Sequence, residues 1–229
     1  FPVEKGETFS EINKFKNMPV IIAGRRAIFP DKPHIYSDNF KGGYIAAKYL
    51  LRLGRKRIAF FAGFWNPPCS HIDIKKISSE PGAGAFSSLD RFNGYLKALE
   101  EASVDFDKEL VNLCSYDFNA GIIAAKELIA RMVPVDAIIC PNDLVAAGAM
   151  QFLTRQGIKI PEDISVVGYD DDSLAIMTSP ELTTIKQDMT RIGKESVIMI
   201  NNLINGKTVE DTVIDVELVI RNSTSLANS

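Results

Sequence analysis

Acidic and amide side chains lie in three of the connections that lead into predicted helices. They are Asp38, Asn142 with Asp143, and the run Asp170-Asp171-Asp172. Carboxylates accept hydrogen bonds and amides both donate and accept them, so such groups can bind a polar ligand. Neighbouring carboxylates can also perform acid–base chemistry, but the sequence offers no nucleophile or second acid beside Asp170–Asp172. The pattern therefore favours binding over catalysis.

These residues also have a structural alternative. A polar residue just before a helix commonly caps the helix N-terminus, and Asn142 fits that role as well as it fits a binding role. Three successive acids after Gly168-Tyr169 are less well explained by capping, because one side chain would suffice.

Metal and disulfide chemistry lack their usual motifs. The two histidines, His34 and His71, have no partner at the spacing of metal ligands. The three cysteines, Cys69, Cys114 and Cys140, are odd in number and form no C-x-x-C pair, which argues against a disulfide framework and a zinc site. We therefore expect no metal, and the unpaired cysteines fit a cytoplasmic protein.

Nucleotide and nucleophile motifs are also missing. The segment 205–208 (Asn-Gly-Lys-Thr) lacks the upstream glycine of a phosphate loop, and 82–84 (Gly-Ala-Gly) lacks the strand and third glycine of a dinucleotide site. No G-x-S-x-G elbow occurs. We expect neither a cofactor nor an enzyme activity.

Composition and charge limit the partners of the chain. Its 229 residues, 46% hydrophobic and 24% charged, suit one large domain or two lobes. The net charge is −3 and the basic residues are scattered, so we do not expect this chain to contact DNA by itself. The densest basic cluster, Arg52–Arg57, is predicted to be a solvated helix end. No apolar run is long enough for a membrane span, and the N-terminus lacks the apolar core of a signal peptide.

Strands and helices alternate along the chain. The predicted strands are 19–23, 57–63, 110–113, 135–140, 164–168 and 213–220, and the predicted helices are 42–53, 88–102, 120–132, 142–156 and 188–205. Continuous apolar strands between helices indicate a parallel sheet covered on both faces, which binds ligands beyond the carboxyl ends of its strands. Segment 65–89, rich in Pro, Gly and Ser, is predicted to be a surface loop beside the pocket.

Three stretches resemble the lactose-repressor/galactose-repressor family of transcription regulators. Residues 161–171 are similar to its P-x-D-[IV]-S-V-[VI]-G-[FY]-D-[DN] motif, 179–187 to S-P-x-L-T-T-[IV]-x-Q, and 218–224 to the ending L-x-x-R-x-S-T. Weaker similarities cover Asp38 to Ala59, where Arg55 replaces a frequent His, and Pro141 to Gly148. The order and spacing of these motifs make the set specific.

The resemblance implies an α/β fold of the type I periplasmic-binding-protein-like class: two doubly wound parallel-sheet lobes joined by three crossovers, with the N-terminal lobe incomplete. Residues 1–62 and 190–212 would form the N-terminal lobe, and 63–189 and 213–229 the C-terminal lobe. The crossovers would fall near 62–64, 187–190 and 212–214. The family's helix-turn-helix headpiece is expected to lie outside this sequence.

The same resemblance implies a set of ligand-binding residues in the cleft between the lobes. Arg91 would begin a helix and bind ligand hydroxyls or a carboxylate, Phe118 would stack on the ligand, and the polar ring would comprise Asp38, Asn142, Asp170 and Gln187. The residues alone leave alternatives open: Arg91 as a surface cation, Phe118 as a core residue and Gln187 as an exposed residue.

The function implied is that of a ligand-sensing domain of a bacterial repressor. A small polar effector, in the commonest case a sugar, would bind in the cleft, reorient the lobes of a homodimer and control allosterically how the headpiece binds operator DNA. The chain would act in the cytoplasm, without a membrane. The alternative is a periplasmic sugar-binding protein of a transport system, a class that carries a signal peptide.

Overall fold

The structure is a computed structural model that describes residues 18–24, 32–64 and 86–227. The chain forms two compact units. Unit 1 comprises Phe1–Ser37 and Asp188–Ile214, and unit 2 comprises Asp38–Gln187 and Asp215–Ser229. The chain thus passes from one unit to the other at three points, after residues 37, 187 and 214.

Unit 1 contains a small parallel sheet. Its strands are β1 (Ile22–Ala23), β2 (His34–Ser37) and β8 (Thr212–Ile214), in the order β1-β2-β8. Helix α7 (Met189–Ile204) packs against β1 and β2. The core of this unit is formed by apolar side chains of the sheet and of α7: Ile35, Ile192, Met199 and Ile214. Asp211 accepts a hydrogen bond from the backbone of the buried His34, which ties the start of β8 to β2.

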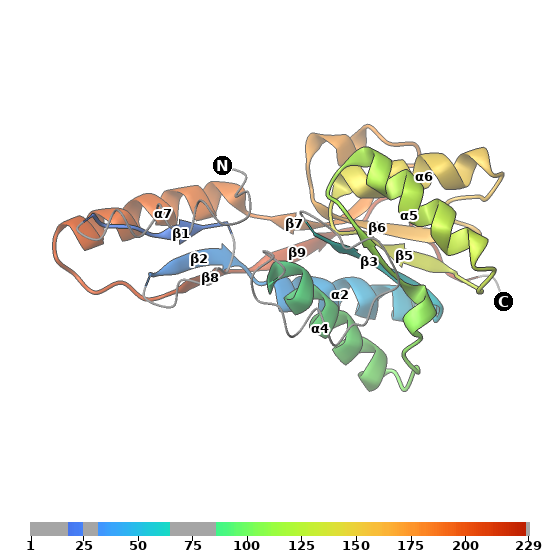
Figure 1. Cartoon of the computed structure of the whole chain (residues 1–229), viewed down its shortest axis with the longest axis horizontal. Coiled ribbons are helices and arrows are strands. Elements are labelled where there is room, and N and C mark those ends of the chain that lie inside the picture. Colours follow the sequence, from blue (N-terminus) through green and yellow to red (C-terminus); the bar gives the residue numbers. More distant parts are fainter. Residues whose placement is uncertain (1–17, 25–31, 65–85, 228–229) are drawn as a thin grey trace. The chain divides into compact units, whose positions relative to one another are not determined.

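Unit 2 is built on a six-stranded sheet in the order β4-β3-β5-β6-β7-β9 (Figure 1). The strands are β3 (Ile58–Gly63), β4 (Val111–Cys114), β5 (Ala137–Ile139), β6 (Ser165–Asp170), β7 (Thr183–Gln187) and β9 (Val216–Val219). All neighbours pair in parallel except β9, which runs antiparallel to β7 at one edge. The carboxyl ends of five strands therefore share one edge of the sheet.

Two pairs of helices cover this sheet. Helices α2 (Asn39–Arg52) and α4 (Phe86–Glu101) lie on one face, and α5 (Phe118–Ala130) and α6 (Asp143–Arg155) on the other (Figure 1). Phe60 of β3 points into the core with α2 and α4, whereas the next residue, Phe61, points into the core with α5 and α6. Successive side chains of a strand point to opposite faces of the sheet, and β3 is buried at every position, so both faces of the sheet are buried. Short 3-10 turns, η3 (Lys108–Leu110) and η4 (Ser173–Ile176), complete the unit.

The prediction of an α/β protein with doubly wound parallel strands is confirmed, with several differences in detail. The single strand predicted at 213–220 is two strands, because the backbone changes sheets at Asp215 and β8 pairs with β2 while β9 pairs with β7. Strands β2 and β7 were not predicted from periodicity. Of the predicted loop 65–89, residues 65–85 lie outside the described part of the chain.

The predicted boundary of the first lobe differs from the boundary of the units. Residues 38–62 were assigned to the N-terminal lobe, and the first crossover to 62–64, but these residues belong to unit 2. The reason is strand pairing: β3 lies between β4 and β5, and α2 packs along α4. The chain changes units at residues 37 and 38 instead.

Arg55 is not part of a solvated helix end, so the prediction for the basic cluster was wrong at this position. Its side chain is only 2% exposed. Its guanidinium donates to backbone carbonyls from distant segments, namely those of Asp136, Pro161, Glu162, Asp163, Ser225 and Leu226. A planar cation with five N–H groups can bind several carbonyls at once, which fastens the C-terminal segment to the rest of unit 2.

We predict that Arg55→Ala lowers the free energy of unfolding by about 3 kcal/mol or more, because several buried carbonyls lose their donor. Lys56→Ala is the matched control in the same basic cluster, where the side chain is exposed and a change within about 0.5 kcal/mol is expected. Urea unfolding followed by circular dichroism measures both. Equal effects of the two substitutions would contradict the role assigned to Arg55.

Glycines allow the two helices of each pair to approach closely. A Cβ on Gly43 of α2 would lie 1.9 Å from the backbone oxygen of Arg91, and one on Gly94 of α4 would lie 2.0 Å from that of Phe40. Between α5 and α6, a Cβ on Gly148 would lie 2.0 Å from the oxygen of Phe118. The absence of these side chains thus fixes the positions of Arg91 and Phe118 relative to the neighbouring helix.

We predict that Gly43→Ala lowers the free energy of unfolding by about 1–3 kcal/mol, because the new methyl group meets backbone and α2 must move away from α4. Gly193→Ala on α7 is the control: nothing lies within 4 Å of its Cβ position, so the better helix propensity should stabilise by up to about 1 kcal/mol. The two substitutions should therefore change the free energy of unfolding in opposite directions. A neutral or stabilising Gly43→Ala would refute the close helix contact.

Candidate ligand-binding site

The predicted binding residues lie around one edge of the sheet in unit 2. Asp38, which precedes α2, and Arg91 of α4 come from one face, while the others follow or end the strands: Phe118 after β4, Asn142 after β5, Asp170 at the end of β6 and Gln187 at the end of β7. Because β3 to β7 are parallel, these ends share an edge. The following contacts join most of the residues into one group.

Arg91 occupies the centre of this group. Its Nε donates to Oδ1 of Asn39 at 2.8 Å, and Nη1 donates to the backbone oxygen of Pro141 at 2.7 Å. The guanidinium carbon lies 3.4 Å from the centre of the Tyr169 ring, a cation–π contact. Arg91 thus connects α4 with α2, with the end of β5 and with β6. It lies in the second turn of α4 and does not begin the helix, because α4 starts at Phe86.

Asp38 caps helix α2. Its Oδ1 accepts a hydrogen bond from the backbone N of Lys41 at 2.9 Å. The cap brings its carboxylate near the group around Arg91, since its neighbour Asn39 binds Arg91 and its charge helps to raise the pKa of Tyr169. The largest cause of the raised Tyr169 pKa is burial, and Arg91 acts in the opposite direction.

Asp170 and Gln187 bind one another across neighbouring strands. Nε2 of Gln187 donates to Oδ1 of Asp170 at 2.6 Å, so Gln187 is not simply an exposed residue. Burial raises the pKa of Asp170, and the charge of Arg91 and the hydrogen bond from Gln187 partly counteract it. Asp170 also has a φ of +114°, which is rare for a residue other than glycine.

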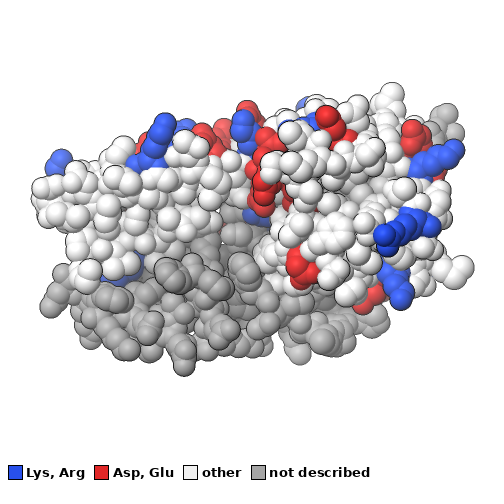
Figure 2. Space-filling view, turned by 90° about the horizontal axis from the view of Figure 1, so that it is seen from above, with Lys and Arg blue, Asp and Glu red and all other residues white. Residues whose placement is uncertain are grey.

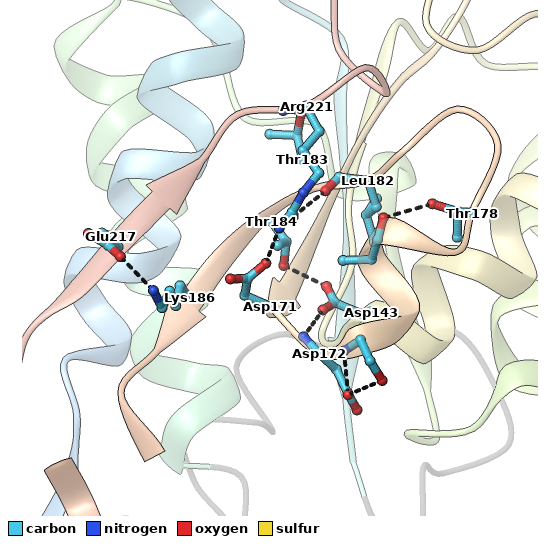
Figure 3. A network of polar contacts seen from close by, with 12 residues as sticks. Asp143, Asp171, Asp172, Thr178, Leu182, Thr183, Thr184, Lys186, Glu217 and Arg221 are labelled. Atoms are coloured by element: carbon cyan, nitrogen blue, oxygen red, sulfur yellow. Dashed lines mark hydrogen bonds and ion pairs between the residues drawn. The ribbon is translucent and has the colours of Figure 1, made fainter. Parts of the chain in front are cut away.

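The three successive acids have three different partners. Asp170 binds Gln187. Asp171 forms an ion pair with Arg221 at 2.6 Å, and Asp172 caps the short turn η4 (Figure 3). Both side chains of the Asp171–Arg221 pair are 15% exposed. One cap therefore accounts for only one of the three acids, as the sequence suggested.

Asn142 fulfils the structural alternative that its position allowed. Its Oδ1 accepts a hydrogen bond from the backbone N of Val145 at 2.8 Å and caps α6. Its Nδ2 donates to the backbone oxygen of Tyr116 at 3.0 Å, which joins the segment after β5 to the segment after β4. Asn142 is next to Pro141, whose carbonyl binds Arg91, so the cap also connects this part of the edge to the group around Arg91.

Phe118 is the first residue of α5 and is half-buried. Asp117 caps this helix by accepting from the backbone N of Ala120 at 2.9 Å. Phe118 is linked to the other residues through the backbone: Tyr116, two residues earlier, accepts the hydrogen bond from Asn142. The aromatic residue that follows Arg91 in α4, Phe92, is 4% exposed and belongs to the core on the other face of the sheet.

Sequence reasoning missed three residues of this group: Asn39, Tyr169 and Asp143. Each is adjacent in sequence to a predicted residue, which was the only available signal. Asp143 is 2% exposed; it accepts from the backbone N of Asp172 at 2.8 Å and from the hydroxyl of Thr184 at 2.5 Å (Figure 3). Burial raises the pKa of its carboxyl to about 7, while these two hydrogen bonds lower it.

The described residues offer no obvious site for other chemistry. They contain no group of three or more His, Cys, Asp or Glu side chains placed to hold a metal ion. Cys114 and Cys140 are buried, and burial raises the pKa of both thiols, which keeps them protonated. None of the helices seen in this part of the chain combines the length and apolar character needed to cross a membrane.

Basic side chains form no stripe on the face that Figure 2 presents. In the described part of that face, Lys and Arg occur singly or in small groups and alternate with acidic residues.

Comparisons with known proteins agree with this architecture. The profile of the family described as "Periplasmic binding protein-like domain" matches residues 47–224. The transcriptional repressor CytR of Escherichia coli (strain K12) is 30% identical over 218 residues, which cover 94% of this chain and 59% of CytR. The chain thus spans less than two thirds of this curated relative.

Solved structures with the same fold are also regulators. The complex of the transcriptional regulator CelR with cellobiose has a TM-score of 0.76 and 29% identity, over 89% of this chain and 58% of CelR. A regulator of the LacI family from Sanguibacter keddieii has a TM-score of 0.75 and 26% identity, over 90% of this chain and 71% of its own. These relatives are named as regulators and not as enzymes. The chain belongs to the periplasmic binding protein-like domain family, in the form found in transcriptional regulators of the LacI family.

Proposed function

We propose that this chain is the effector-binding part of a bacterial transcription repressor, and that a small, uncharged polyhydroxyl molecule of the sugar class binds at the edge of unit 2 around Arg91. The observation that carries this proposal is the arrangement of Arg91, Asp170 and Gln187. The amide of Gln187 donates a hydrogen bond to the carboxylate of Asp170, and burial raises the pKa of that carboxylate whereas the charge of the Arg91 guanidinium lowers it.

The donors and acceptors suit a ligand with adjacent hydroxyl groups. Arg91 donates to Asn39 through Nε and to Pro141 through Nη1, and we assign Nη2 as the donor to a ligand. Asp170 accepts from Gln187 through Oδ1 and retains Oδ2 as an acceptor. A hydroxyl group both donates and accepts, so it can bind between the two. The half-buried ring of Phe118 could cover the C–H face of a sugar.

The charges of this edge favour an uncharged ligand. Asp170 lies near the guanidinium of Arg91, Asp38 lies near the Tyr169 ring on which that guanidinium stacks, and Asp143 lies near Asp170, whereas Asp171 is already paired with Arg221. A phosphate or carboxylate group would meet more negative than positive charge at this edge. We therefore place uncharged sugars before sugar phosphates.

The link to transcription follows from the relatives. The matched region of CytR is 59% of a repressor whose name includes a helix-turn-helix, and we propose that this chain likewise senses a ligand for such a headpiece in the cytoplasm. Binding can shift the affinity for operator DNA only by the difference in ligand affinity of two states, typically about 1–3 kcal/mol. A periplasmic transport protein, the alternative with the same fold, has less support because the curated relative and the solved structures reported above are named as regulators.

The first test is a thermal-shift screen of the chain against uncharged mono- and disaccharides including cellobiose, against sugar phosphates and against purines. We predict that an uncharged sugar raises the melting temperature. Arg91→Ala and Asp170→Ala should each remove that increase, because a lost hydrogen bond to a charged group costs about 1.5–3 kcal/mol. Lys97→Ala, at a solvent-facing position of the same helix α4, is the control that keeps the wild-type response.

Two outcomes would contradict this proposal. If both variants respond to the same sugar as the wild type does, the binding site lies elsewhere in the chain. If only sugar phosphates raise the melting temperature, the argument from charge is wrong, and if only purines raise it, the sugar class is wrong; the site could still be correct in both cases.

We also propose that two copies of the chain associate, partly through the apolar residues Ile176 and Met177 of unit 2, which are 58% and 72% exposed. Large apolar side chains next to one another at a surface are typical of protein contacts. Met177→Asp should therefore shift the chain toward the monomer in sedimentation velocity. Met132→Asp is the control, an equally apolar residue that is 90% exposed after α5. A wild-type monomer, or a shift caused equally by both variants, would exclude this surface.

A further inference from the structure

A buried carboxylate connects three elements next to the candidate site. Asp143 begins α6 and is 2% exposed. Its Oδ2 accepts from the backbone N of Asp172, and its Oδ1 accepts from Thr184 of β7 (Figure 3). Both oxygens are thus used, one on the turn after β6 and one on the neighbouring strand.

Strand β6, which lies between β5 and β7, leaves room for the carboxylate. A Cβ on Gly168 of β6 would lie only 2.3 Å from Oδ1 of Asp143. Any larger residue at position 168 would displace the acid from its place above the strand. The glycine in the middle of a buried strand is therefore explained by the approach of Asp143.

The turn that Asp143 binds has an unfavourable backbone conformation. Asp170 has a φ of +114° and Asp171 a φ of +58°, and residues other than glycine rarely adopt such values. Such a conformation persists when surrounding contacts hold it, and it is common at ligand-binding sites. Here three contacts hold it: Gln187 binds Asp170, Arg221 pairs with Asp171, and Asp143 binds the backbone of Asp172.

We propose that Asp143 is a positioning residue of the site: its ionised carboxylate holds the turn Asp170–Asp172 in the conformation that directs Asp170 toward the ligand. The inference rests on the proposed function, since it assigns Asp143 a role in ligand affinity. Helix capping does not explain the residue, because Asn142 already caps α6. Favourable interaction with the helix N-terminus does not require burial either, because an exposed acid achieves it.

The protonation of Asp143 gives this role a pH dependence. The ionised carboxylate accepts both hydrogen bonds, whereas the protonated acid, like an amide, has one acceptor and one donor, so only one of the two hydrogen bonds keeps its direction. Since burial raises the pKa to about 7, ligand affinity should weaken as the pH falls from 8 to 6. The titratable groups that face Asp143 are Cys140, Asp170 and Asp171; the first stays protonated, and Asp171 is paired with Arg221.

Stability has the opposite pH dependence. An unfolded Asp has a pKa near about 3.9, so between about pH 4 and 7 the folded chain binds this proton more tightly than the unfolded chain. The contribution of Asp143 to stability therefore falls as the pH rises through this range. Asp143→Asn removes the buried charge, so it should not lower the melting temperature at pH 8. A purely stabilising role for the carboxylate would predict a decrease.

The first experiment measures amide hydrogen exchange of residues 170–173 in the ligand-free chain at pH 8. Asp143→Ala should speed this exchange at least tenfold relative to the wild type, whereas Asp143→Asn, whose amide oxygen can still accept from Asp172, should stay within threefold. Asp163→Ala is the matched control: this acid accepts from the backbone N of Lys159 at 2.8 Å, before the opposite end of β6. It should leave exchange at 170–173 unchanged.

The second experiment measures the binding of cellobiose, or of the uncharged sugar found in the screen, at pH 6, 7 and 8. We expect Asp143→Ala to weaken binding at least tenfold at pH 8. Asp143→Asn, which has the donor and acceptor arrangement of the protonated acid, should bind at all three pH values about as the wild type binds at pH 6, and so abolish the weakening between pH 8 and pH 6.

The outcomes separate this inference from the proposed function. Wild-type exchange at 170–173 in Asp143→Ala, wild-type affinity in that variant, or an unchanged pH dependence in Asp143→Asn would each overturn the role of Asp143. Equal loss of binding in the Ala and Asn variants would do so as well. If no sugar binds the wild type, the proposed function fails, and the exchange measurement still decides whether Asp143 holds the turn.

Discussion

The candidate site depends on the interactions of the Arg91 guanidinium. It donates to a side chain at the start of α2 and to a carbonyl after β5, and its face lies on the ring of Tyr169 in β6. Three segments that are distant in sequence are thereby held at one edge of the sheet. A lysine could supply the charge but not the planar face with two directed donors, so the geometry requires arginine.

This position of Arg91 is itself determined by a close approach of two helices. The backbone oxygen of Arg91 occupies the place where any larger residue at Gly43 would put its Cβ. The same arrangement recurs on the other face of the sheet, where Gly148 admits the backbone of Phe118. Helix α4, which carries Arg91, thus packs against α2, and Asp38 caps α2. Helix α5, which begins with Phe118, packs against α6, and Asn142 caps α6.

Capping and binding are therefore not exclusive roles for these polar residues. A cap fixes a side chain at the start of a helix, and helices of this fold start at the carboxyl edge of the sheet. Asp38 and Asn142 each accept a hydrogen bond from a backbone N–H through Oδ1, and that hydrogen bond determines where the rest of the side chain lies. The capping and binding interpretations of these two residues describe the same geometry.

Sequence reasoning recovered the parts of the fold whose signal is local. Strands such as β3 and β6 are apolar at almost every position, because both of their faces are buried. Strand β7 was missed because its Thr183 and Thr184 are polar, although both are fully buried and their hydroxyl groups are hydrogen-bonded. The assignment of residues 38–62 failed because a strand has the same pattern whichever sheet it joins, and only its pairing partners distinguish the two.

Contacts between distant segments were beyond prediction for the same reason. Arg55 appears in the sequence as one of several basic residues at a helix end. The carbonyls that accept its hydrogen bonds come from positions between 136 and 226. The burial of Asp143 is likewise invisible next to Asn142, since it depends on a glycine and a threonine in two other strands. The resemblance to a family supplied residues such as Arg91 and Gln187, for which neither periodicity nor spacing gave a signal.

Asp143 illustrates why local rules fail at such a place. A buried carboxylate that accepts only from neutral donors is costly, and its pKa near 7 expresses that cost in this chain. An apolar residue or an amide at position 143 would avoid the cost, and selection for stability alone would favour one. The turn beside it requires an acceptor for the backbone N of Asp172 while two consecutive residues have positive φ values. A residue that is unfavourable for folding and suited to holding a strained turn is expected where binding, and not stability, sets the requirement.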